Sequence, residues 1–348
     1  MAGLFQTYQL LEVQRKFKRL PSFWLNFFPR QVNFEEEAIA FDKVHVNYAR
    51  LAPFVAPTAQ GRVLKHEGFH RKAFKPAYVK PKDVVDPNMI LPVQPGEIPA
   101  MGKLSLAQRR AAVITYLLQQ QRAMHENRWE WMAAQAAIYG YVDVAGEDYP
   151  TTRVDFGRDA ALTITANWKD VAAKPLDDIY AARRIANDKS LSGATVTKII
   201  MGATAWGDFY AREKDRLKDL MDKNQVNGNT GVTKLWDGFE GIEYMGRISG
   251  FTGGGLIEIW VDTRKYTDEA GQMQYLMPQN GCVGISEAIQ GVRCFGAILD
   301  KGAGYQALPF YPKNWENEDP SVEYLMSQGA PLMVPSDPNA SFLIKTST

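Results

Sequence analysis

The side chains that could perform catalysis or bind a metal are few and poorly placed in this sequence. The four histidines are His45, His66, His70 and His125. His66 and His70 have the four-residue spacing of a helical zinc site, but Gly68 lies between them in a strand-like segment. Cys282 and Cys294 have no further ligands at a suitable spacing, so we expect buried apolar thiols. The sequence therefore predicts no metal site.

Motifs that bind nucleotides or perform hydrolysis are also missing. The sequence contains no phosphate-binding loop, dinucleotide fingerprint, zinc-protease helix, nucleophile elbow or redox dithiol. The glycine-rich stretch 250–255 lacks the lysine of a phosphate-binding loop and precedes a predicted strand, whereas such a loop should open a helix. The consecutive carboxylates at 35–37 are typical of a solvated face. We predict no cofactor and no enzymatic activity, with an enzyme of unrecognised site as an alternative.

A basic stretch is more informative. Its cations are Arg62, Lys65, Arg71, Lys72, Lys75, Lys80 and Lys82, and before Asp83 only Glu67 opposes them. This stretch could be an exposed edge that prevents strand aggregation, a contact with nucleic acid, or a surface that docks on acidic groups of a neighbouring subunit. The net charge of the whole chain is only +1. Because the rest of the chain compensates the basic stretch, subunit docking is the favoured interpretation.

Length and composition indicate two folded modules. The chain has 348 residues, of which 45% are hydrophobic, enough for two cores. It has two cysteines and no secretory signature near its beginning, so we expect synthesis in a reducing cytoplasm. No apolar run approaches the ~20 residues of a membrane span, and no membrane partner is expected.

The first ninety residues predict an arm and an extended hairpin. Residues 1–40 contain an aromatic cluster, between two prolines, that must pack either on its own core or on another surface: Phe23, Trp24, Phe27 and Phe28. Residues 41–90 alternate like strands and hold several prolines, which exclude a central position in a sheet. An isolated hairpin is marginally stable in water, so this excursion must lie on its own body or on a neighbouring subunit.

A long helix is predicted over residues 106–139. Ser105 is a suitable N-cap, the run contains no Gly or Pro, and Gly140 fits the C-terminal stop. Its length would be roughly 50 Å. An apolar stripe is expected at Ile114, Leu117, Leu118, Met124, Trp129, Met132 and Ala136. The charges predicted around that stripe include Glu130.

The remaining chain predicts a mixed α+β architecture. Residues 141–175 read as a hairpin with a turn near 146–150. A second module at 176–304 has a helix beginning near 177, a helix at 203–222 interrupted at Gly207, and five strands. The strands are expected at 196–201, 242–248, 256–261, 272–277 and 292–299, and residues 267–271 are expected to form a hairpin turn. The proline-rich tail 305–348 is expected to rejoin the module of the long helix.

Three segments resemble a known family. They are FKPAYVKPKDVVDP (74–87), VDFGR (154–158) and YPKNWENEDPSVEYLMSQGAPLMVPSDP (311–338). They are similar to segments of the lambda-type major capsid proteins of tailed phages, and weaker similarity extends from about residue 17 to about 343. The resemblance implies the Hong Kong 97-like capsid fold. In that fold residues 1–40 form the N-terminal arm, 41–90 the E-loop, 106–139 the spine helix, and 176–304 the axial domain. Residues 91–175 and 305–348 form the peripheral domain.

The resemblance also implies function and partners. The chain would form pentamers and hexamers that close an icosahedral shell around packaged double-stranded DNA, as the major capsid protein of a virion assembled in a bacterial cytoplasm. Implied partners are a scaffolding protein, a portal and a decoration protein. The prolines at 87–100 suggest a hinge used during expansion of the shell. A phage tail or tube protein remains an alternative, which a structure without a long spine helix would favour.

Overall fold

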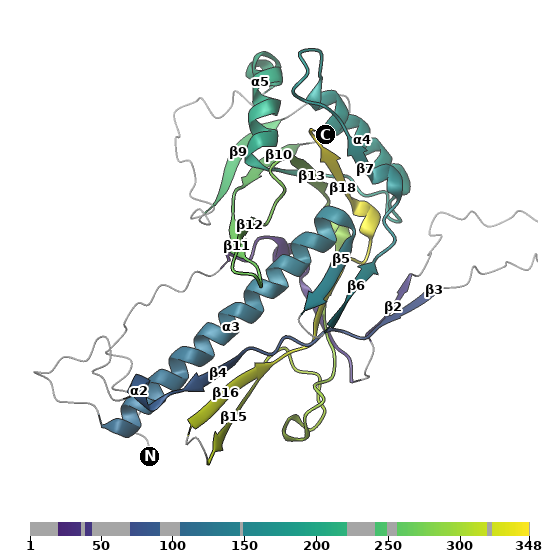
Figure 1. Ribbon diagram of the computed structural model, residues 1–348. Coiled ribbons are helices and arrows are strands. Elements are labelled where there is room, and N and C mark those ends of the chain that lie inside the picture. The colour runs from purple at the N-terminus through teal and green to yellow at the C-terminus, as the bar shows by residue number, and fades with distance from the viewer. Residues whose placement is uncertain are drawn as a thin grey trace, which may run out of the picture.

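A single long helix connects two groups of strands (Figure 1). The computed structural model describes residues 20–35, 39–43, 70–90, 105–146, 149–220, 241–248, 256–318 and 322–347. Helix α3 (Leu106–Tyr139) crosses the molecule diagonally, with one sheet beside its N-terminal half and another beyond its C-terminal end. The observed mixture of helices and strands agrees with the predicted α+β class.

Helix α3 begins and ends at the predicted residues. At its start the Gln108 backbone N–H donates to Ser105 Oγ, and the Gln108 side chain accepts from the Ser105 N–H, which completes a capping box. At its end Gly140 adopts a left-handed φ of 74° and donates to the Ala136 carbonyl. The predicted range and both caps are confirmed.

A six-stranded sheet forms the centre of the larger group. Its order is β7 (Thr163–Thr165), β18 (Ser341–Lys345), β13 (Gly281–Ile285), β8 (Lys198–Met201), β10 (Ile257–Asp262) and β9 (Ile242–Ile248). Successive side chains of a strand point to opposite faces. In β8 the side chain of Ile200 enters one hydrophobic cluster, while those of Ile199 and Met201 enter the other. The sheet is therefore buried on both faces.

Different elements cover the two faces of this sheet. Helices α4 (Pro175–Lys189) and α5 (Ala203–Leu220) cover one face, with Leu176, Ile179 and Phe209 in its cluster. The other face is covered by the C-terminal half of α3, through Met132 and Ile138, and by a segment that precedes β1. Three layers result: paired helices, sheet, and spine helix.

The N-terminal half of α3 packs on a smaller antiparallel sheet. Its strands are β15 (Tyr311–Asn317), β16 (Val322–Gln328) and β4 (Lys82–Val85), in that order. Val85 and Leu325 point inward and pack on Val113 and Leu117 of the helix. Segments near both ends of the chain are thus held on one half of the spine helix.

The remaining strands form four smaller pairings. β1 (Arg30–Asn33), β14 (Val292–Phe295) and β17 (Pro331–Val334) make a three-stranded sheet. The hairpins are β5 (Tyr141–Gly146) with β6 (Tyr149–Asp155), β11 (Lys265–Thr267) with β12 (Met273–Tyr275), and β2 (Ile39–Lys43) with β3 (His70–Phe74). A short helix, α2 (Pro87–Ile90), follows β4. The first two hairpins surround the predicted turns.

Three local predictions were wrong. Helix α5 passes through Gly207 without interruption. Strand β13 was not predicted, because all its residues are buried and no alternation reveals it. On α3, Met124 of the expected apolar stripe is 44% exposed, whereas Glu130 is fully buried. The helix faces two different surfaces along its length, so one stripe does not describe it.

The strand pairing also differs from the simple domain ranges. Within the predicted E-loop, β2 and β3 form a hairpin, but β4 joins the sheet on α3, and residues 44–69 lie outside the described part. In the tail, β16, β17 and β18 all contact α3, as expected, and β18 also lies in the six-stranded sheet. Conversely β14, from the predicted axial range, pairs with β1 and β17. The domain boundaries themselves stay predictions.

Gly140, which ends α3, can be tested against Gly207, which lies within α5 and serves as the control. We expect Gly140→Ala to destabilise the chain by at least about 1–2 kcal/mol, because the residue is left-handed. A Cβ there would also lie 2.6 Å from Arg158 Cβ. Gly207→Ala should stabilise by about 0.5–1 kcal/mol, because the site is helical and a Cβ there meets nothing within 4 Å. Urea denaturation measures both, and a neutral Gly140→Ala would contradict the assignment.

Candidate functional site

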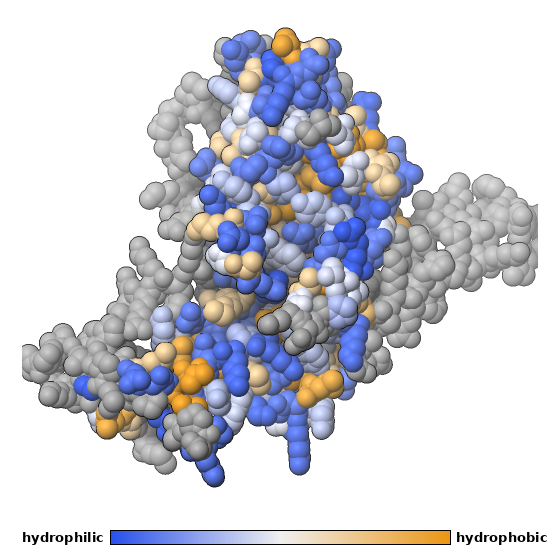
Figure 2. All heavy atoms as spheres, in the orientation of Figure 1, coloured by the Kyte–Doolittle hydropathy of each residue, from blue (hydrophilic) through white to orange (hydrophobic). Residues whose placement is uncertain are grey.

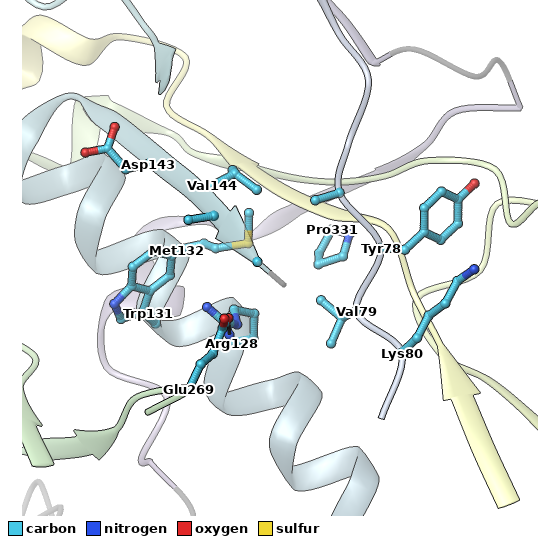
Figure 3. A pocket seen from close by; sticks show the side chains of 13 residues that line it. Tyr78, Val79, Lys80, Arg128, Trp131, Met132, Asp143, Val144, Glu269 and Pro331 are labelled. Carbon is cyan, nitrogen blue, oxygen red and sulfur yellow. Dashed lines mark hydrogen bonds and ion pairs between the residues drawn. The ribbon is translucent and has the colours of Figure 1, made fainter. Parts of the chain in front are cut away.

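The hollow in Figure 3 lies between residues 77–80, α3 and the end of β5 and has a volume of about 310 Å³. Trp131, Met132 and Val79 supply apolar lining. Its charged groups are largely neutralised, since Arg128 pairs with Glu269 at 2.8 Å and Asp143 is held by the guanidinium of Arg153. The arrangement does not bring two uncompensated carboxylates together for acid–base chemistry.

Both cysteines are buried and free, as expected. Burial raises the pKa of the Cys294 thiol to about 12 and also raises that of Cys282. His70 lies on β3, while His45 and His66 fall outside the described residues. Across the ranges that the structure describes, no three His, Cys, Asp or Glu side chains gather in a metal-binding group. No helix in these same ranges is both long and apolar enough for a membrane span.

The aromatic cluster of the predicted arm is buried in the chain's own core. Phe23, Trp24, Phe27 and Phe28 are at most 7% exposed; Trp24 and Phe27 are the end residues of the short helix η1 (Trp24–Phe27), and Phe23 and Phe28 cap it. The Phe23 ring lies 5.8 Å from that of Trp260 on the central sheet. Of the two surfaces that the sequence left open, the structure selects the intramolecular one for these four side chains.

A single carboxylate holds the backbone of this segment. Glu130 on α3 accepts hydrogen bonds from the backbone N–H groups of Phe23, Trp24 and Leu25, at 2.8–3.0 Å. These N–H groups lie at the beginning of η1, where no residue of the short helix can accept them. The spine helix therefore supplies the acceptor that the segment lacks.

Arg264 completes the buried network. Its guanidinium donates two hydrogen bonds to Asp262, at 2.9 and 2.7 Å, one to Glu130 at 2.9 Å, and one to the Pro21 carbonyl at 2.6 Å. Asp262 also accepts from the indole N–H of Trp24 at 3.1 Å. All three charged side chains are at most 2% exposed. We call Glu130, Asp262, Arg264 and Trp24 the anchor network.

Burial and pairing act in opposite directions on these charges. Burial raises the pKa of Glu130, and Arg264 with the backbone N–H donors acts against that rise. Burial would lower the pKa of Arg264, but its hydrogen bonds to Asp262 and the attraction of both carboxylates raise it. The arginine thus stays charged, because each of its three nitrogens donates to an oxygen.

Further contacts extend the anchoring to residues 20–33, which we call the N-terminal segment. The Leu20 N–H donates to Asn127 Oδ1 on α3. Arg293 on β14 donates to the carbonyls of Phe28 and Leu25, at 2.7 and 3.0 Å. Strand β1 then pairs with β14 in parallel. The segment is therefore bound along its whole described length.

Sequence reasoning did not find the anchor network. Glu130 was expected among the charges around the apolar stripe of the helix, and Asp262 and Arg264 were not singled out. One signal was available: Asp262 ends the apolar strand β10 and Arg264 stands two residues further on, a spacing that places both on one side of an extended chain. Nothing local indicates Glu130, because its partners lie more than 100 residues away.

The described residues of the basic stretch lie on different elements. Lys82 Nζ lies 3.9 Å from the centre of the Tyr324 ring, and Lys80 Nζ lies 4.7 Å from that of Tyr78, so both cover aromatic rings of this chain. Arg71 and Lys72 lie on β3 of the projecting hairpin (Figure 1). Lys75 follows β3 and is exposed, and Arg62 and Lys65 lie outside the described residues. Their role in subunit docking stays a prediction.

The architecture defines the class of protein. A crystal structure of a prophage capsid protein from Escherichia coli CFT073 superposes with a TM-score of 0.67 and 25% identity over 98% of this chain and 97% of that one. The chain therefore has a Hong Kong 97-like capsid fold, as the resemblance implied.

Sequence comparison identifies the family. The profile described as phage major capsid protein E matches residues 6–346, and the chain belongs to this family. The major capsid protein of Enterobacteria phage P21 is 32% identical over 99% of both chains. That of Escherichia phage lambda is 29% identical over 97% of both. This is a family of structural capsid proteins and not of enzymes.

The anchor network can be tested by removing its central acceptor. We expect Glu130→Ala to destabilise the full chain by about 3–5 kcal/mol, because it leaves Arg264 partly unpaired in a buried site. The matched control is Glu126→Ala on the same helix, where loss of the exposed pair with Arg122 should cost less than about 1 kcal/mol. Denaturant unfolding and limited proteolysis of the N-terminal segment provide the measurements. Equal effects of the two substitutions would contradict the anchor.

His125 makes stability depend on pH. It is fully buried on α3, with Nε2 3.1 Å from Ser327 Oγ and its ring against Phe310, and burial lowers its pKa to about 4. In the unfolded chain His125 is protonated near pH 6.5, whereas in the folded chain it stays neutral until about pH 4. The free energy of unfolding therefore falls as the pH drops from 6.5 towards 4.

We expect protonation of His125 in the unfolded chain to lower the free energy of unfolding by about 2 kcal/mol when the pH is changed from 8 to 5. His125→Phe should abolish that part of the pH dependence and leave the contribution of other groups. The measurement is denaturant unfolding of both proteins at several pH values. Parallel profiles of wild type and variant would show that His125 does not carry this dependence.

Proposed function

We propose that this chain is the shell subunit of a tailed-phage head, in which pentamers and hexamers close an icosahedral capsid around double-stranded DNA. The observation that carries the proposal is the match of residues 6–346 to the phage major capsid protein E family. The alternative of a tail or tube protein required a structure without a long spine helix, and α3 has 34 residues.

In this proposal each subunit has a rigid body and a projecting hairpin, β2–β3, that binds a neighbouring subunit. The hairpin β2–β3 pairs only five residues on each side, and a two-stranded hairpin gains stability when it packs on another surface. In the shell, the E-loop of one subunit lies across the next. Heterologous contacts of this kind form a closed ring when the rotations from each subunit to the next add up to a full turn. The N-terminal arm, peripheral, axial and hinge regions take the ranges given above.

The partners follow from the same proposal. A scaffolding protein guides assembly, a portal occupies one vertex, and a decoration protein binds the finished shell. The subunit encloses DNA without sequence-specific contacts, which agrees with a net charge of +1. Synthesis and assembly take place in the cytoplasm of the bacterial host, and the mature location is the virion.

Co-expression tests the function. The full chain is produced with the scaffolding gene that neighbours it, and the particles are measured by sedimentation and electron microscopy. Regular hollow shells are expected. A discrete small oligomer that never forms shells would contradict the proposal and return attention to the enzyme alternative.

Charge reversal tests the docking of the basic stretch. Changing Arg71, Lys72 and Lys75 together to Glu should abolish shells while the unassembled chain keeps its far-ultraviolet spectrum and melting temperature, because the docked surface would repel an acidic neighbour. A matched control reverses three exposed cations elsewhere, Lys169, Lys174 and Arg184. Normal shells from the first variant, or loss of shells from both, would refute docking through the basic stretch.

A further inference from the structure

Residues 154–158, VDFGR, lie where the spine helix meets the six-stranded sheet. The motif begins with the last two residues of the return strand β6, in which Val154 pairs with Val142 of β5. Val154 and Phe156 are buried in the same hydrophobic cluster as the C-terminal half of α3. The Phe156 N–H donates to the carbonyl of Gly140, the residue that ends the helix. The motif therefore crosses directly over the helix terminus.

Arg158 connects this terminus to the sheet. Its Nη1 donates to the Ile138 carbonyl at 2.8 Å, and its Nη2 donates to Thr163 Oγ1 at 3.0 Å. Ile138 belongs to the last turn of α3, and the helix itself provides no N–H donor for the Ile138 carbonyl. Thr163 begins β7, which pairs with β18 of the six-stranded sheet. One planar guanidinium thus spans two structural units.

The space around this bridge is closely filled. A Cβ on Gly140 would lie 2.6 Å from Arg158 Cβ, so the helix end and the arginine stem are in direct contact. Burial lowers the pKa of Arg158 to about 10, which still leaves the side chain protonated at neutral pH. A cation at this position also interacts favourably with the C-terminal end of the helix dipole.

A second set of contacts secures the next residue. The Asp159 N–H donates to Asn339 Oδ1 at 2.9 Å, and Asn339 Nδ2 donates to the Lys189 carbonyl at the end of α4. Lys189 Nζ pairs with Asp159 Oδ2 at 3.1 Å. Arg158 and Asp159 are therefore held from opposite sides, by the spine helix and by the helix that covers the sheet.

We propose that Arg158 is a positioning residue that sets the angle between the spine helix and the six-stranded sheet, and through it the curvature of the shell. This inference rests on the proposed function as a shell subunit. A small rotation at the joint would be repeated in every subunit, so the local geometry determines the size at which a shell closes.

The test separates positioning from stability. Arg158→Lys keeps the charge at the helix end, but an ammonium group cannot present a planar fork to two acceptors at once. Thr163→Val removes only the sheet-side acceptor and retains a shape and a β-branch suited to a strand. The matched control is Arg183→Lys, a buried arginine that donates to the Val196 carbonyl within the sheet module.

Each variant is co-expressed with the scaffolding protein, and the diameter distribution is measured by electron microscopy beside the melting temperature of the unassembled chain. We expect Arg158→Lys and Thr163→Val to broaden the distribution several-fold, and Arg183→Lys to keep the wild-type diameter despite a similar loss of stability. Wild-type diameters from a folded Arg158→Lys protein would overturn the inference.

Two further outcomes are decisive. If Arg158→Lys does not fold, Thr163→Val alone decides, and wild-type diameters from it overturn the inference. Broadening by Arg183→Lys to the same extent would show that lost stability is the cause, which also overturns it. Absence of shells from the wild-type chain would instead refute the proposed function.

Discussion

The anchor network is the interaction on which the rest of the structure depends. Glu130, Asp262 and Arg264 are removed from water, and the desolvation cost is offset only while every oxygen and N–H finds its partner. The partners come from the spine helix, the central sheet and the N-terminal segment. Docking of that segment and closure of the core are therefore coupled, since loss of one element leaves buried charge in the other two.

The spine helix α3 connects the anchor network to both groups of strands. Its N-terminal half packs on β4 and β16, and its C-terminal half covers one face of the six-stranded sheet. The polar groups buried along it, including His125 and Glu130, bind partners on different elements. The body becomes one connected unit, from which the hairpin β2–β3 projects (Figure 1). The face in Figure 2 carries mostly hydrophilic residues with scattered hydrophobic ones, as is usual for the surface of a folded protein.

Prediction from the sequence succeeded where local rules suffice and failed where packing decides. The hairpins β5–β6 and β11–β12 were predicted because turn residues and alternation are local signals. Strand β13 was missed because a fully buried strand has no alternating face, and Gly284 within it is required by the close approach of the Phe342 ring. Gly207 was read as a break because its cost in a helix is small enough for tertiary packing to override.

The sequence by itself determined the spine helix, because its capping box, its run without Gly or Pro and its terminal Gly140 act within a few residues of one another. It also indicated the capsid family, through the resemblance of residues 74–87, 154–158 and 311–338 to segments of lambda-type capsid proteins. Only the tertiary structure decided that Glu130 is buried, that the aromatic cluster packs on its own core, and that Arg158 joins helix to sheet. These assignments depend on partners that only the fold brings together. The partner of Glu130, for example, lies 134 residues away, and a local sequence pattern does not predict which distant residue it will contact.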